Sequence, residues 1–199
     1  MPTKPEPIAK VVFTLEYCGL PAIAPYLHAR CSPPLRQQHV VLPHFSSHYM
    51  RIVLQRVRHA KVTVESRITG QIGPGLLVLA GFAPDDDARS LDWMARKLVQ
   101  MRIFSDEEGK MNRSVQDIGG EVLVVSQFTL LADARKGNRP SYIGAAPPPV
   151  AIPLYQEFVQ LLEKLLGQPV PTGEFGADMK VELLNDGPVT IVLDSPEGN

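Results

Sequence analysis

A Gly-Pro dipeptide near the end of the chain, Gly187-Pro188, separates two strand-like runs at 180–184 and 189–193. Proline fixes φ and has no backbone N–H, and X-Pro bonds adopt the cis form at modest cost. The chain therefore either turns here in the common trans form or carries a cis bond between two strands. A cis bond would point successive carbonyls to one side and make a rigid pair of acceptors with no side chain in the way.

A second informative segment, Ser126-Gln127-Phe128-Thr129-Leu130, follows an apolar strand-like run at 121–125. It places three polar side chains where a strand ends, and loops at such positions often carry binding or catalytic residues. Taken alone, the segment is also consistent with ordinary hydrogen bonds at a strand end.

Two stretches have the apolar spacing of amphipathic helices. The first opens at Asp85-Asp86-Asp87, three acids that favour the positive end of a helix dipole, and runs to about Arg102. The second lies around 154–165 and ends at Gly167, where glycine commonly terminates a helix.

The remaining regular pattern is strand-like and is punctuated by Gly73-Pro74-Gly75. We expect an α/β fold, a compact strand-rich single domain with a β-barrel-like sheet and two main helices. The predicted strands are a pair at 50–57 and 62–64, followed by 76–81, 121–125, 169–172, 180–184 and 189–193.

Residues 1–49 differ in composition from the rest and hold eight of the nineteen prolines, four of the five histidines and both cysteines. The segment has no cationic start followed by a sustained apolar core, as a secretory signal would. Histidines at 39–48 beside Cys31 raise a metal hypothesis, but their spacing matches no standard zinc pattern. We interpret the segment as a disordered N-terminal extension, or as a start assigned too far upstream of Met50, and 50–199 as the functional domain.

Charge and hydropathy limit the partners of this domain. Residues 50–199 hold 16 Lys and Arg against 19 Asp and Glu. A protein that coats nucleic acid without sequence preference is normally basic, so we expect no DNA partner and at most a small pocket for one RNA end. Apolar runs are strand-sized, so we also expect no membrane partner.

The domain is poor in catalytic side chains. It has one histidine, His59, and no cysteine, which excludes a Cys-His pair and a His/Cys metal cluster. A Ser-His-Asp triad would require His59, and the sequence has no G-x-S-x-G elbow. No phosphate-binding or dinucleotide fingerprint is present. Paired carboxylates stay open, although nothing points to them. We therefore expect catalysis through backbone donors and substrate groups, without a metal or cofactor.

The segments 126–129 and 185–190 together resemble the D-aminoacyl-tRNA deacylase family of the D-tyrosyl-tRNA deacylase type, whose signatures are SQFT and NxGPVT. The resemblance implies a two-fold homodimer with active sites at the subunit interface. It also implies a cytoplasmic, RNA-binding hydrolase of translation quality control that releases D-amino acids, or mischarged glycine, from tRNA. Further ordered matches lie at 50–57, 73–79, 102–104, 109–112, 119–123, 135–141, 144–147 and 175–179.

The resemblance also implies roles for three residues of chiral selection. Gly187 and Pro188 of one subunit would reach into the pocket of the other, accept the α-ammonium group and exclude an L side chain. Glycine has no side chain to exclude, which would make glycyl-tRNA a substrate. Arg56 matches the arginine that holds the Gly-Pro motif across the interface, and a solvated strand arginine is the alternative.

The catalytic candidates lie in the other motif. Backbone N–H groups of Gln127, Phe128 and Thr129 are candidates for an oxyanion hole. Phe128 forms either a pocket wall or core. Thr129 is either a nucleophile or, as we favour, a supporting hydrogen-bonding group, with the terminal ribose 2′-hydroxyl positioning the water in RNA-assisted catalysis. Ser126 and Gln127 are candidates for contacts with the terminal adenosine.

Three cations, Arg135, Lys136 and Arg139, form the best local basic cluster, for RNA phosphates or simply for solubility. Two other functions stay open for the whole chain. One is a tRNA-end binding module without turnover. The other is an editing domain for L-amino acids, against which the intact Gly187-Pro188 argues.

Overall fold

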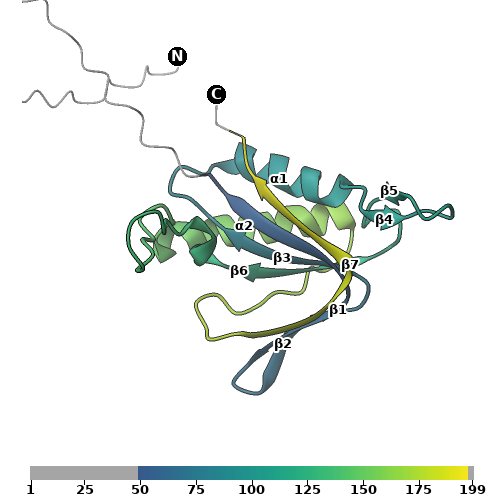
Figure 1. Cartoon of the computed structure of the whole chain (residues 1–199), viewed down its shortest axis with the longest axis horizontal. Helices are drawn as coiled ribbons and strands as arrows, with labels where there is room; N and C mark the ends of the chain where they lie inside the picture. The colour runs from purple at the N-terminus through teal and green to yellow at the C-terminus, as the bar shows by residue number, and fades with distance from the viewer. Residues whose placement is uncertain (1–48, 197–199) are drawn as a thin grey trace, which may run out of the picture. The chain divides into compact units, whose positions relative to one another are not determined.

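The computed structural model describes residues 49–196 and shows a five-stranded sheet that curls into a half-barrel, with two helices against one face (Figure 1). The predicted extension 1–49 lies outside the described residues, apart from Tyr49. Within 49–196, no helix is long and apolar enough to cross a membrane. The elements are β1 (Arg51–Val64), β2 (Arg67–Ile72), β3 (Gly75–Gly81), α1 (Ala88–Gln100), β4 (Phe104–Ser105), β5 (Met111–Arg113), β6 (Glu121–Ser126), the 3-10 helix η1 (Phe128–Leu131), α2 (Pro148–Leu166) and β7 (Lys180–Asp194).

The long strand β1 organises the sheet. Its first half pairs with β3, its second half pairs with β2, and β7 follows it along nearly its whole length. These pairs are antiparallel, whereas β3 and β6 are parallel. Because β6 lies at one edge and β7 at the other, the two sequence motifs lie on opposite sides of the sheet.

Three strand predictions need correction. The predicted pair at 50–57 and 62–64 is one continuous strand, β1, because the exposed residues Arg58 and His59 between them keep the strand conformation and His59 pairs with Leu184 of β7. The runs at 180–184 and 189–193 are likewise one strand, β7. The predicted strand at 169–172 is only a single bridge between Val124 and Thr172.

Helix α1 begins later than its acidic run predicts. Asp87 is the N-cap, whose carboxylate accepts hydrogen bonds from the backbone N–H groups of Arg89 and Ser90, both at 3.0 Å. Asp86 instead turns inward and accepts from the N–H groups of Met50 and Ala83 at 2.9 and 2.7 Å. Burial raises the pKa of Asp86. The acids thus precede the first turn rather than forming it. Helix α2 ends at Gly167 in the left-handed conformation, as predicted.

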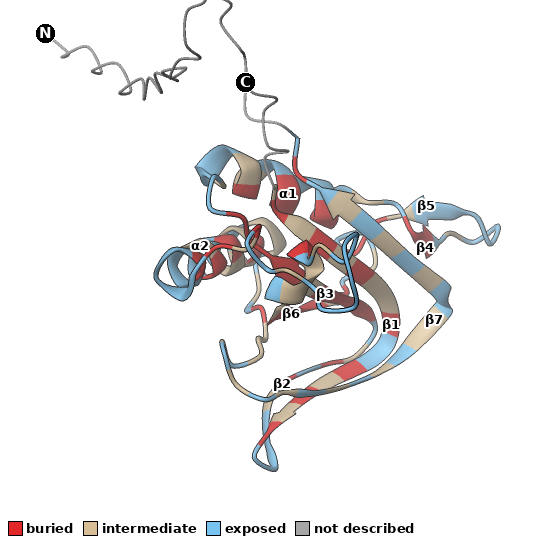
Figure 2. Cartoon of the chain, turned by 60° about the vertical axis from the view of Figure 1, so that its left-hand side comes forward, coloured by how far each residue is buried: buried red, intermediate tan, exposed pale blue. Residues whose placement is uncertain are grey.

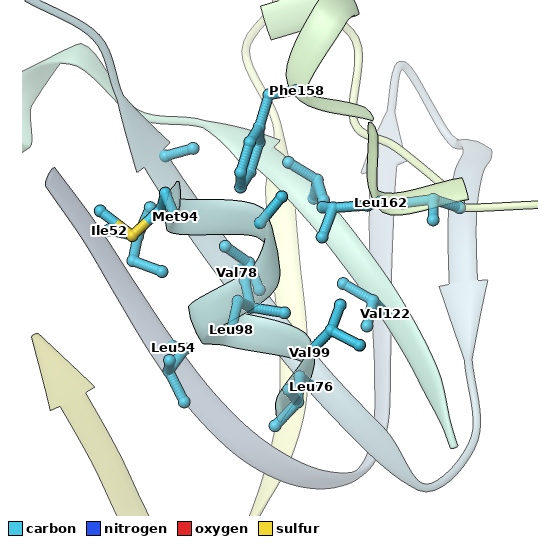
Figure 3. Packing of buried hydrophobic residues seen from close by; sticks show 14 of the residues in the cluster. Ile52, Leu54, Leu76, Val78, Met94, Leu98, Val99, Val122, Phe158 and Leu162 are labelled. Atoms are coloured by element: carbon cyan, nitrogen blue, oxygen red, sulfur yellow. The ribbon is translucent and has the colours of Figure 1, made fainter. Parts of the chain in front are cut away.

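The hydrophobic core consists of two apolar clusters. One apolar cluster fills the space between the sheet and both helices, where Met94, Leu98 and Val99 of α1 meet alternate residues of β1, β3 and β6 (Figure 3). Phe158 and Leu162 of α2 complete it. A smaller cluster around the second half of β1 packs under the curled end of β7. Along β7 itself residues alternate between exposed and half-buried, and none is fully buried (Figure 2).

Candidate active site

A cavity of about 550 Å³ opens at the C-terminal end of β6, a size typical of small-molecule sites. Ser126, Gln127 and Phe128 form one wall, where β6 passes into η1. Tyr142 and the segment 175–179 form other parts of the lining. The structure therefore brings three of the four predicted catalytic residues to one concave surface.

Helix α2 forms part of this cavity and is fixed to β6 behind it. The hydroxyl of Tyr155 donates to the carbonyl of Val124 at 3.0 Å. Burial raises the pKa of Tyr155 to about 12, so the phenol stays a donor at physiological pH. The strand end that carries Ser126 is consequently held by a neighbouring helix as well as by β3.

The cavity lining is mostly apolar, and Asp178 is its one charged side chain. Asp178 forms an ion pair with Lys180 at 2.9 Å, and both side chains are well exposed. Among the residues at 49–196, no group of three or more His, Cys, Asp or Glu is placed to hold a metal ion. Besides the Asp178 carboxylate, the polar groups available for chemistry are hydroxyls, one amide side chain and backbone N–H groups.

One of the three backbone N–H groups predicted for the oxyanion hole, that of Gln127, already has a hydrogen-bond partner. The N–H of Gln127 donates to the carbonyl of Ala80 at 2.7 Å, which extends the pairing of β6 with β3 and removes it as a free donor. The N–H groups of Phe128 and Thr129 open η1, and the first N–H groups of a helix have no partner within it. These two donors remain the candidates at the end of the strand.

Phe128 forms a wall rather than core, because 56% of it is exposed and its ring lies edge-to-face against Tyr142. Thr129 does not line the cavity. Its hydroxyl accepts a hydrogen bond from the side-chain amide of Gln127. An amide is no general base, so this contact favours the supporting role for Thr129 over the nucleophilic one.

The second motif forms a wide bulge in β7. Between two paired positions, β7 advances from Asn185 to Thr190 while β1 advances only from Gln55 to Val57. The residues between these positions, 186–189, lie opposite Arg56 alone and include Gly187 and Pro188, whose connecting peptide bond is cis. The structure thus gives one continuous strand with a local irregularity, where the sequence left a turn or a cis joint open.

Side chains on both strands fix this bulge. The side-chain oxygen of Asn185 accepts from the N–H of Val189 at 2.9 Å, and its amide donates to the hydroxyl of Thr190 at 3.1 Å. Gln55 on β1 donates to the same hydroxyl at 3.2 Å. Sequence reasoning assigned no role to Asn185 or Thr190, although both belong to the motif.

Arg56 lies opposite the bulge and is largely buried, with 11% of its side chain exposed. Its Nε donates to the carbonyl of Asp186 at 2.9 Å, and Nη1 donates to the carbonyl of Ile103. A Cβ added to Gly187, which has φ of +135°, would lie 3.0 Å from Nη2 of Arg56. This arginine therefore holds the motif within its own chain, where the resemblance implied a contact across the dimer interface.

Gly187 and Pro188 are exposed and do not line the cavity of their own chain. Within a single chain the two motifs are therefore separated. Residues 126–128 lie at the cavity on the β6 edge, and the Gly-Pro bulge lies on β7.

The predicted basic cluster lies in the loop between Asp133 and Ser141, which pair through two backbone hydrogen bonds of 2.8 Å. Arg135 is tied back to Asp133 by an ion pair of 2.6 Å. Lys136 and Arg139 are exposed. The loop emerges beside Tyr142, one of several lining residues that sequence reasoning did not propose for the site.

Known proteins resemble this chain over most of the described domain. The sequence profile of a family described as D-Tyr-tRNA(Tyr) deacylase matches residues 53–194. The chain belongs to this family. Members named D-aminoacyl-tRNA deacylase include one from Chlorobaculum parvum, 60% identical over 74% of this chain and 99% of the relative. Another, from Parabacteroides distasonis, is 56% identical over 73% of this chain and 97% of the relative.

Two solved structures have a similar fold over most of the described domain. One, described as a c-Myc DNA unwinding element binding protein, has a TM-score of 0.70 at 42% identity and covers 74% of this chain and 99% of its own. A second, described as a probable eukaryotic D-amino acid tRNA deacylase, has a TM-score of 0.63 at 20% identity over 73% and 98% of the two chains. The second likeness supports the α/β fold alone.

Proposed function

We propose that this chain hydrolyses the ester bond of D-aminoacyl-tRNA, and of mischarged glycyl-tRNA, releasing the amino acid and free tRNA in the cytoplasm. The observation that carries this proposal is the presence in one chain of an apolar cavity where η1 begins and of an exposed Gly-Pro bulge on β7. Both features lie in a chain whose relatives are named D-aminoacyl-tRNA deacylase.

In the proposed reaction, water attacks the carbonyl carbon of the ester and the ribose oxygen leaves as the tRNA hydroxyl. The N–H groups of Phe128 and Thr129 donate to the oxyanion, and loss of one such donor typically lowers kcat by about 10²–10³-fold. The terminal 2′-hydroxyl positions the water, since the lining provides no histidine or cysteine. The aminoacyl ester is already activated, so these groups are sufficient without a metal.

The proposed active form is a homodimer. Because the bulge of one chain does not line that chain's cavity, a second chain has to supply Gly187 and Pro188 to the pocket. Their carbonyls then accept the α-ammonium group, and the exposed backbone leaves no room for a side chain of L configuration. Met50 starts the proposed functional domain, and residues preceding it take no part in the reaction.

The name of one structural relative refers to DNA, but we propose no DNA-binding function here. Residues 50–199 carry more acidic than basic residues, whereas a surface that binds a duplex backbone needs an excess of cations.

Substitution of Gly187 by alanine tests whether the bulge takes part in the proposed reaction. The added Cβ would lie 2.8 Å from the Val189 side chain, so the bulge must shift. We expect Gly187→Ala to lower the rate of D-Tyr release from D-Tyr-tRNA by at least about ten-fold, as for a misplaced binding group. Gly73→Ala is the matched control, because its Cβ meets only the flexible Glu121 side chain at 3.4 Å. Equal activity of the two variants would refute the role of the bulge.

A further inference from the structure

Two exposed aromatic rings stand together at the cavity. Phe128 and Tyr142 are 56% and 42% exposed, and their ring centroids lie 5.1 Å apart with an interplanar angle of 68°. Both also line the cavity. Exposed aromatic side chains that adjoin a pocket commonly contact a ligand. The proposed hydrolysis gives Tyr142 no part in the chemistry.

The position of Tyr142 connects these rings to the basic loop. Tyr142 directly follows Ser141, whose two hydrogen bonds with Asp133 close the loop that carries Arg135, Lys136 and Arg139. The carbonyl of Tyr142 accepts from the N–H of Ala145 at 3.0 Å, which fixes the turn after it. Cations and an exposed aromatic side chain therefore lie next to each other in the chain, and the aromatic side chain lines the cavity.

This combination suits a single-stranded nucleic acid. Proteins bind single strands with cations along the backbone and with aromatic side chains on which bases stack, largely irrespective of sequence. The edge-to-face arrangement of Phe128 and Tyr142 leaves ring surface exposed for a base. The cavity, at about 550 Å³, has the size to take an amino acid with its terminal nucleoside, which leaves the next base of the strand outside.

We propose that Tyr142, together with Phe128, is a stacking platform for the penultimate base of the tRNA 3′ end, while the loop cations bind the adjoining phosphates. This inference rests on the proposed deacylase function. Tyr142 is a positioning residue in this scheme, because it holds the strand and touches no reacting atom.

The test compares Tyr142→Ala, Tyr142→Phe and the wild type on two substrates, D-Tyr-tRNA and D-tyrosyl-adenosine, which lacks the penultimate base. We expect Tyr142→Ala to raise KM for D-Tyr-tRNA by roughly 5- to 150-fold, the effect of one lost base stack, with kcat retained. KM for D-tyrosyl-adenosine should rise by a much smaller factor, since Tyr142 also lines the cavity that takes this part of the substrate. Tyr142→Phe should restore the wild-type KM because it keeps the ring.

Ile143→Ala is the matched control, since Ile143 is the next residue, is 92% exposed and does not line the cavity. The Kd for uncharged tRNA, measured by fluorescence anisotropy, tests base stacking on Tyr142 without any need for turnover. This Kd should rise by a similar factor in Tyr142→Ala and stay unchanged in the other two variants. An unchanged KM and Kd would overturn the proposal, as would an equal loss on both substrates. Absence of turnover by the wild type would instead refute the deacylase function. The Kd comparison would still show whether Tyr142 contributes to tRNA binding.

Discussion

At the scale of single residues, Arg56 shows how a largely buried guanidinium fixes the Gly-Pro bulge. It donates to carbonyls of two separate segments, those of Asp186 and Ile103, and its charge lies 6.0 Å from the ring centre of Phe104. A planar fork with several donors makes both contacts at once. The solvated strand arginine that the sequence also allowed is thereby ruled out.

Replacement of Arg56 by lysine is expected to destabilise the protein. A single ammonium group cannot reach both carbonyls, so one buried acceptor loses its partner, at a cost of about 1–3 kcal/mol. Urea denaturation at a fixed protein concentration measures this as a lower free energy of unfolding. Deacylation of D-Tyr-tRNA should fall as well, because the Gly187 bulge loses its support.

Arg58→Lys provides the control for this prediction. Arg58 forms an ion pair with the same Asp186 at 3.2 Å, but 70% of its side chain is exposed. Exposed pairs contribute about 0–1 kcal/mol, so little change is expected. If the two variants unfolded alike, the supporting role of Arg56 would be wrong.

At the scale of elements, β7 is the strand through which two chains are expected to meet. It pairs only with β1 among the described strands, and Leu184 and Val192 are 49% and 57% exposed. A long edge strand with exposed apolar residues is prone to associate with another chain. The bulge lies in this strand, so association through β7 would also carry Gly187 and Pro188 to a partner.

Placing a charge on β7 tests this association. Val192→Lys would bury an unpaired ammonium group at the contact, and we expect the dimer dissociation constant to rise by about 10- to 100-fold. Sedimentation velocity over a concentration series measures the shift, and deacylation should fall in parallel. Met111→Lys adds the same charge at a residue that is 55% exposed on β5, away from β7. Val192→Lys that sediments like the wild type would count against a β7 interface.

Hydrophobic periodicity reports on local structure only, which limited how well the sequence predicted the helices and strands. Helix α2 and its glycine terminus followed from local spacing. The continuity of β1 and β7 did not, because pairing between distant segments, rather than burial, holds the residues around Arg58 and the Gly-Pro bulge in the sheet. The start of α1 was also misplaced, since Asp86 is drawn inward by Met50, a residue far away in the chain.

Within the candidate site, the sequence located only the part of the cavity lining that one short motif contains. Residues 126–128 line the cavity, as a polar strand end suggested. The segment 175–179 and Tyr142 were missed as lining residues, because only the fold brings them to β6. The engaged N–H of Gln127 was equally out of reach, since its acceptor, Ala80, lies on another strand.

At the scale of the whole molecule, the sheet keeps two motifs apart that the proposed chemistry needs together. The cavity lies where β6 ends, and the bulge lies on the opposite edge strand. The proposed two-fold pair of chains would resolve this separation, with each chain contributing a cavity to one site and a bulge to the other. Under this proposal, backbone atoms rather than a side chain would read chirality.

The most direct measurement is the release of free tyrosine from D-Tyr-tRNA and from L-Tyr-tRNA by the purified chain, with a metal chelator present. We predict release from the D ester alone at a rate that the chelator leaves unchanged, because backbone donors perform the catalysis and the Gly187-Pro188 backbone excludes L side chains. Release from both esters at similar rates would contradict chiral exclusion, and release from neither would contradict the deacylase function itself.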